Sequence, residues 1–217
     1  MIPAVGAEFV ARMEDVLDLD AEPHDPARPV VCFDETSKQL IAETRLPLPM
    51  EPGKPERVDY EYEREGTANL FLVTEPHTGW RHVDVTDRRT KHDFAQQMRE
   101  LVDRHFPDAT TIRVVLDNLN THTPGALYEA FTPAEARRIL RKLEFHYTPV
   151  HGSWLNMAEL EFSMLARQCL GRRIGDRDTL ATEIAAWEAA RNEHRATITW
   201  QFTVDDARRK LHRLYPS

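Results

Sequence analysis

The chain has 217 residues, a formal charge of −8 and 41% hydrophobic residues, enough apolar material for the core of one sizeable soluble domain. This composition excludes a disordered or fibrous chain, and no apolar run approaches the roughly 20 residues that a membrane helix needs. The acidity also argues at first sight against a nucleic-acid partner, because phosphate binding usually leaves a basic footprint.

The front of the chain holds most of the negative charge. Residues 1–66 carry 16 acids and 7 bases, a net of −9, whereas residues 67–217 have a net charge of +1. The stretch 14–29 mixes acids with three prolines and shows no apolar periodicity. Residues 1–28 are therefore predicted to be an acidic arm or linker, with one amphipathic turn at residues 9–13, and residues 29–217 the domain it enters.

The predicted strands begin directly after this arm. Residues 29–33 form a short β-branched and apolar run that reads as a fully buried strand, and Asp34 and Glu35 follow it. After a Pro-rich loop over residues 46–57, a hairpin is predicted from strands at 68–73 and 80–85. A second buried strand is predicted at residues 111–116, and it also ends in an acid, Asp117.

The predicted helices surround these strands. Thr90 is placed to cap a helix that runs to about His105, and Thr132 begins a capping box with Pro at the first helical position. Ser153 is predicted to cap a long helix to about Leu170. The remaining elements are a short strand at 144–148 and helices at 176–195 and 204–214. This order predicts an α/β fold with a sheet covered by helices.

Two acids at the ends of buried strands suggest a site, because ligands in α/β sheets gather at strand ends. Adjacent strands would bring Asp34 and Asp117 together, and a helix over 154–162 offers a third carboxylate. At about 100° per residue, Glu159 lies at the margin of the apolar stripe of that helix, while Glu161 points well away from it. Glu159 is therefore the better candidate for a site against the sheet.

Three carboxylates without a Cys or His cluster favour hard cations such as Mg²⁺ or Mn²⁺. Two such ions can activate a water or a 3′-hydroxyl and stabilise the leaving oxygen of a phosphodiester. Acids also end strands simply because strand ends are solvated, so the spacing alone leaves both interpretations open.

Several ordered strings carry a more specific signal: VVCFDE, VVLDNLNTH and TPVHGSWLNMAELEF, followed by QCLGRRIGD, AAWEAARNEHRATITWQFT and DDARRKLHRLYP. Together they resemble the catalytic domain of DDE transposases, in the bacterial insertion-sequence branch of the mariner-like superfamily, over about residues 13–216. The resemblance implies an RNase H-like fold, with a mixed sheet of parallel core strands and an antiparallel hairpin flanked by helices. It also implies that Asp34, Asp117 and Glu159 are the three catalytic, metal-binding acids.

The activity implied by the resemblance is metal-dependent cleavage of DNA at transposon ends and joining of the 3′-ends to target DNA. It implies Mg²⁺ or Mn²⁺, two ions together, as the cofactor, DNA as the partner, and a homodimer as one assembly. No organic cofactor and no membrane partner are expected. Asp117 and Glu159 lie further apart than in the common family pattern, which predicts an insertion around residues 123–138. The N-terminal helix-turn-helix modules usual in such transposases are absent from this sequence, so sequence-specific end binding is not expected.

Five further residues are candidates for DNA contact. Asn118 and His122 follow the second acid on a loop, His151 precedes the helix of the third acid, and Arg172 and Arg173 follow it. Ordinary loop hydrogen bonding is the alternative for the first two, and a solvated surface is the alternative for the arginines. Glu35 should point away from Asp34 and have a supporting role. Trp154 is interpreted as a core residue, with base stacking as the alternative.

Three other functions remain open from the sequence. An RNase H-like nuclease such as a resolvase would hydrolyse DNA without joining ends, and an inert relic would act only as an interaction module. A zinc hydrolase using His122, His146 or His151 with Asp117 lacks an HExxH pair. Cys32 and Cys169 show no zinc-ligand spacing, and no secretory signal precedes them, which favours a reduced, cytoplasmic chain, nucleoid-associated when bound to DNA.

Overall fold

The computed structural model describes residues 6–44 and 61–216, and it contains a five-stranded mixed sheet in the order β3-β2-β1-β4-β5. Strands β1, β4 and β5 run parallel, while β2 lies antiparallel between β1 and β3. Their bounds are Val30–Glu43 for β1, Tyr62–Glu75 for β2, Trp80–Thr86 for β3, Ile112–Leu116 for β4 and Leu143–Tyr147 for β5. The predicted combination of parallel core strands and an antiparallel hairpin is confirmed.

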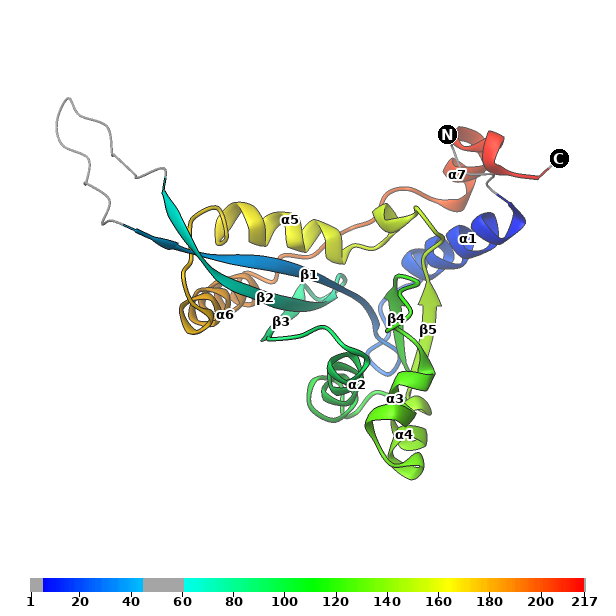
Figure 1. Cartoon of the computed structure of the whole chain (residues 1–217). Helices are drawn as coiled ribbons and strands as arrows, with labels where there is room; N and C mark the ends of the chain where they lie inside the picture. The colour runs from blue at the N-terminus through cyan, green and yellow to red at the C-terminus, as the bar shows by residue number, and fades with distance from the viewer. Residues whose placement is uncertain (1–5, 45–60, 217) are drawn as a thin grey trace.

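Helices cover both faces of the sheet (Figure 1). One layer contains α1 (Ala7–Ala21), α5 (Ala158–Gln168), α6 (Arg177–Glu193) and α7 (Val204–Lys210). The other contains α2 (Lys91–Glu100), its continuation η1 (Leu101–His105), α3 (Pro124–Ala130) and α4 (Pro133–Leu140). Two short 3₁₀ turns complete the chain, η2 (Ser153–Leu155) and η3 (His212–Leu214).

Strand alternation divides the core into two clusters. In β1, Cys32 packs in the cluster under α1 and α5, while Phe33 packs in the cluster under α2 and α3. The same alternation places Val115 and Val114 of β4 on opposite faces. A carboxylate at residue 34 therefore emerges on the α5 face and one at residue 35 on the α2 face.

Strand β1 is much longer than the sequence predicted. Asp34 and Glu35 do not end it, because the strand continues as a hairpin with β2 as far as the pairing of Glu43 with Tyr62. Its parallel pairing with β4 stops at Cys32 and Val115. The prediction failed because residues 36–39 are polar and not buried, so they interrupt the apolar run after Phe33.

The predicted arm is also corrected. Residues 7–21 form helix α1, which buries Met13, Val16, Leu17 and Leu19 in the core. These apolar residues recur at helical spacing between acids. The segment was predicted to be an arm because its high charge outweighed this apolar spacing in the sequence analysis. The predicted loop at residues 46–57 lies outside the described residues.

Helix starts were predicted well except at α5. Thr90 and Asp93 form a capping box, the Thr132 hydroxyl accepts from the Glu135 N–H, and Asp176 caps α6. Ser153 does not cap α5, because it begins η2 and the helix starts only at Ala158. The region of the predicted insertion forms the short helices α3 and α4.

Asp20 near the end of α1 predicts a pH-dependent stability. Both of its carboxylate oxygens are buried without a hydrogen-bond partner, and burial raises its pKa from 3.8 to about 7. Because the folded pKa exceeds the unfolded one, the free energy of unfolding falls as pH rises from about 4 to 7. We expect Asp20→Asn to raise the free energy of unfolding by about 4 kcal/mol at pH 8 while changing it little at pH 4.

The measurement is urea unfolding of both proteins at pH 4, 6 and 8. An unchanged difference in unfolding free energy across this series would contradict the buried ionisation of Asp20.

Within the described ranges, no helix combines the length and apolar character required to cross a bilayer.

Candidate active site

Asp34 and Asp117 meet where β4 ends beside β1. The parallel register pairs Cys32 with Val115, and two further residues along each chain bring Asp34 level with Asp117. The sequence analysis predicted that Asp34 and Asp117 would each follow the end of a strand. In the structure only Asp117 does so, because Asp34 lies within β1.

The acids act on one another electrostatically. Burial, together with the charges of Asp117, Glu35 and Glu159, raises the pKa of Asp34 to about 7. A hydrogen bond from the Glu35 N–H to Asp34 Oδ1, at 2.9 Å, opposes this rise. The site thus accumulates negative charge in a partly desolvated place, an arrangement that a bound cation would relieve.

Glu159 faces Asp34 across an open groove between β1 and α5. It lies in the first turn of α5, and its side chain is exposed. Both acids line the groove together with Lys38, Phe162 and other residues of the two elements. The structure therefore brings the three predicted acids to one place.

Asn156 fixes the start of α5 against the sheet, a role that the sequence analysis missed. Its buried side chain donates from Nδ2 to the carbonyl of Phe33 at 2.8 Å and accepts at Oδ1 from the Ala158 N–H at 3.2 Å. The two bonds connect the residue before Asp34 with the residue before Glu159. An Asn two residues before a helix start is a local signal for this geometry.

Glu35 and His122 lie on the α2 face of β1, and His122 reaches Asp117 from there, so the three residues form a chain of charges. His122 Nε2 lies 2.8 Å from Glu35 Oε2, and Nδ1 hydrogen-bonds Asp117 Oδ1 at 2.6 Å. Although burial alone would lower it, the two carboxylates raise the pKa of His122 to about 9, and the pKa of Asp117 is lowered by the same hydrogen bond despite its burial. The His122 ring is thus protonated at neutral pH and orients Asp117.

Two predictions about these residues differ in outcome. Glu35 has the supporting position expected of it. His122 was predicted to contact DNA, but its side chain is only 1% exposed and its ring packs against Phe33 and Phe94. A ring enclosed in this way has no face to offer a phosphate, so that prediction is wrong.

Glu161 was expected to point away from the core, yet its side chain is 1% exposed. Arg191 of α6 binds it through two hydrogen bonds of 3.2 and 2.8 Å, and Arg81 Nε of β3 lies 3.0 Å from its Oε2. Arg81 also donates to the carbonyl of Ala196 at 2.7 Å. A buried ionic cluster therefore joins α5, α6 and the sheet two residues beyond Glu159.

The other candidates for DNA contact lie at the surface. Asn118 is exposed and donates to the carbonyl of Thr148 at 3.1 Å, and His151 is exposed with a left-handed φ of 66°. Arg172 pairs with Glu183 at 2.5 Å and Arg173 with Glu43 at 2.6 Å. The four residues come from three segments: Asn118 follows β4, His151 lies between β5 and η2, and Arg172 and Arg173 lie between α5 and α6.

Trp154 does not belong to the core. Its side chain is 40% exposed, and it stacks on Trp200 with ring centroids 6.4 Å apart and meets Phe202 edge-on. The apolar spacing of this residue could not distinguish a core position from a surface aromatic cluster.

The donor set fits hard cations. The three acids supply oxygen ligands alone, as Mg²⁺ and Mn²⁺ prefer. In the described part of the chain their ligand atoms do not all lie within 4.8 Å of one another, so the set is open rather than closed around one ion. The histidines of the alternative zinc site do not gather, since His146 hydrogen-bonds Asp15 and Glu144 instead of approaching Asp117.

Comparison with known proteins decides the family. Residues 29–181 match the model of a family described as DDE superfamily endonuclease. The chain belongs to the DDE superfamily endonucleases. A search of curated proteins finds no match to this DDE endonuclease.

Solved structures of Mos1 show the same fold. The Mos1 mariner paired-end complex with Mn aligns at a TM-score of 0.59 and 14% identity, covering 88% of this chain and 58% of that one. The Mos1 transposase paired-end complex with left transposon end aligns at a TM-score of 0.59 and 14% identity, covering 90% of this chain and 61% of that one. The Mos1 strand transfer complex aligns at a TM-score of 0.58 and 13% identity, covering 87% of this chain and 58% of that one. The RNase H-like fold is confirmed, and this DDE endonuclease spans about three fifths of each Mos1 chain.

Proposed function

We propose that this DDE endonuclease is the catalytic part of a transposase of the bacterial insertion-sequence branch. It would cut DNA at transposon ends and join the resulting 3′-hydroxyl to target DNA. The observation that supports this most directly is the convergence of Asp34, Asp117 and Glu159, which the fold brings together from β1, the end of β4 and α5. The similar Mos1 structures, one a paired-end complex with the left transposon end and one a strand transfer complex, are consistent with it.

Asp34, Asp117 and Glu159 would hold Mg²⁺ or Mn²⁺, two ions in the proposed mechanism. When bound, such ions make a water or 3′-hydroxyl nucleophilic and stabilise the leaving oxygen. The protein's own part is positional: His122 holds Asp117, and Asn156 holds α5 against the strand of Asp34. His122 and Asn156 are both buried, so the protein itself positions Asp117 and the start of α5.

DNA would approach from the exposed side of α5. Glu159 is exposed there, and Asn118, His151, Arg172 and Arg173 are the proposed phosphate or base contacts around it. The net charge of the whole chain is −8, which predicts feeble binding without divalent ions and stronger binding with them. A homodimer on paired DNA ends is part of this proposal.

The test is a joining assay with a labelled oligonucleotide that presents a free 3′-hydroxyl, a plasmid target and Mg²⁺ or Mn²⁺. We expect a covalent product with the wild type and with Asp108→Asn, an exposed acid near the start of β4, and none with Glu159→Gln. Nicking without any joined product would show that the enzyme only hydrolyses DNA. Equal joining by Glu159→Gln would refute the proposed site.

A further inference from the structure

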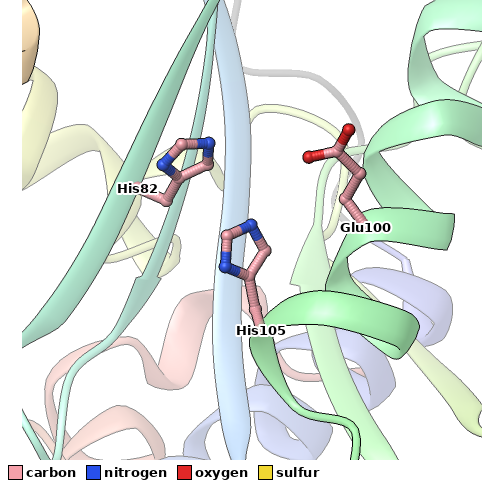
Figure 2. Close-up of side chains that lie close together, drawn as sticks. All are labelled: His82, Glu100 and His105. Carbon is pink, nitrogen blue, oxygen red and sulfur yellow. The ribbon is translucent and has the colours of Figure 1, made fainter.

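A second group of metal-ligating side chains lies away from the three acids. His82 of β3, Glu100 at the end of α2 and His105 at the end of η1 each offer a ligand atom, and these atoms lie within 4.8 Å of one another. Figure 2 shows the three side chains converging on the space between the edge strand and the helix. Among the described residues, this is the one group of three or more His, Cys, Asp or Glu that meets this distance.

The backbone brings Glu100 and His105 to one side. In a regular α-helix, residues five apart point about 140° away from each other around the axis. Residues Leu101–His105 form a π-helical turn instead, which the Phe106 N–H closes by donating to the carbonyl of Leu101 at 2.9 Å. The wider turn brings both side chains towards β3, and such turns occur frequently at functional sites.

A carboxylate behind His82 orients its ring. Glu188 Oε1 lies 3.1 Å from His82 Nδ1, and Glu188 Oε2 accepts from the Val83 N–H at 2.8 Å. With Nδ1 occupied by this carboxylate, Nε2 of His82 is the nitrogen available to a metal. A carboxylate that holds the far side of a ligating imidazole is the usual support of histidine metal sites.

The second histidine is held by aromatic neighbours. The His105 ring lies 4.9 Å from the Trp80 ring and 4.7 Å from the His82 ring, centroid to centroid. Glu100 offers a carboxylate oxygen to the same group, and its side chain is 41% exposed.

We propose that His82, Glu100 and His105 bind one divalent transition-metal ion, with Zn²⁺ as the preferred ion, in a site separate from the catalytic acids. Two imidazoles and one carboxylate suit Zn²⁺ and not Mg²⁺, and three protein ligands leave one position for water or another ligand. The ion would connect the edge strand β3 to α2 and η1. Glu188 would act as a positioning residue behind His82.

The experiment is calorimetric titration of the whole chain with ZnCl₂ in the presence of excess Mg²⁺, accompanied by thermal unfolding with and without Zn²⁺. We expect one Zn²⁺ per chain and a raised melting temperature for the wild type. His105→Gln and Glu100→Gln should each weaken Zn²⁺ binding at least about 100-fold, and Glu188→Gln about 10- to 100-fold. Glu100 is partly exposed, so its variant tests the site without disturbing the fold.

Two control variants separate this proposal from adventitious binding and from the catalytic site. His212→Gln removes an exposed histidine elsewhere and should bind Zn²⁺ as the wild type does. Asp117→Asn should also retain it, although it loses DNA cleavage. Equal Zn²⁺ affinity of the wild type and His105→Gln, or loss of Zn²⁺ in Asp117→Asn, would overturn the proposal, while leaving the proposed transposase activity to its own test.

Discussion

Replacing Asp34 with Asn is expected to abolish metal-dependent DNA cleavage, by about 10³-fold or more, while making the folded protein more stable. The carboxylate lies in a partly buried place where Asp117, Glu35 and Glu159 repel it, and its pKa is raised to about 7. An amide keeps the hydrogen bond that the Glu35 N–H donates to Oδ1 but carries no charge. A catalytic acid in this position is therefore retained at the expense of stability.

The sign of the pH effect follows from the raised pKa. The stability of the protein with neutral Asp34 is fully present below pH 4 and is lost as pH rises through about 7. The melting temperature of Asp34→Asn should therefore exceed that of the wild type most clearly at pH 8. Thermal unfolding at pH 5 and pH 8, with and without Mg²⁺, measures this. Mg²⁺ should raise the melting temperature of the wild type and of Asp108→Asn but not of Asp34→Asn. A variant less stable than the wild type at pH 8 would contradict the repulsion.

Breaking the buried ionic cluster should have the largest effect on stability. Glu161→Gln removes the carboxylate that lies 3.0 Å from Arg81, whose side chain is 0% exposed, and Arg191 loses its ion-pair partner as well. Removing one member of a buried ion pair typically costs about 3–5 kcal/mol, because the remaining charge stays desolvated. We expect a loss in this range in urea unfolding, and reduced cleavage because α5, which carries Glu159, is no longer anchored to β3 and α6.

A double-mutant cycle distinguishes an ionic effect from a packing effect. Arg81→Met removes the most buried cation, and the double variant Arg81→Met with Glu161→Gln should be much less unstable than the sum of the two single losses. Arg172→Met, which breaks the exposed pair with Glu183, is the control and should change stability little. Additive losses for Arg81 and Glu161 would show that the two charges do not stabilise each other.

The sequence predicted the elements that have a strong local signature. The buried runs before Asp34 and Asp117 were recognisable because strands covered on both faces are continuously apolar, and the caps at Thr90 and Asp176 have characteristic residues. The approach of Asp34 to Asp117 was predicted from the parallel pairing of the two buried runs, although Asp34 lies within β1 rather than at its end.

The features that it missed depend on contacts between distant segments. The length of β1 comes from pairing with β2, and the burial of Glu161 comes from Arg81 and Arg191, which lie in other elements. His122 reads as a polar loop residue until its contacts with Glu35 and Asp117 are known. Helical spacing does not identify such partners. A charged residue such as Glu161 is predicted to be exposed unless the sequence indicates which opposite charge lies beside it.

The most direct test of the proposed active site is nicking of supercoiled plasmid DNA, measured with Mg²⁺, with Mn²⁺ and with EDTA. The wild type and Asp108→Asn should nick in either metal and not in EDTA, whereas Asp117→Asn should lose nicking while circular dichroism shows an intact fold. Nicking by Asp117→Asn at the wild-type rate, or by the wild type in EDTA, would contradict a metal-dependent site built on Asp34, Asp117 and Glu159.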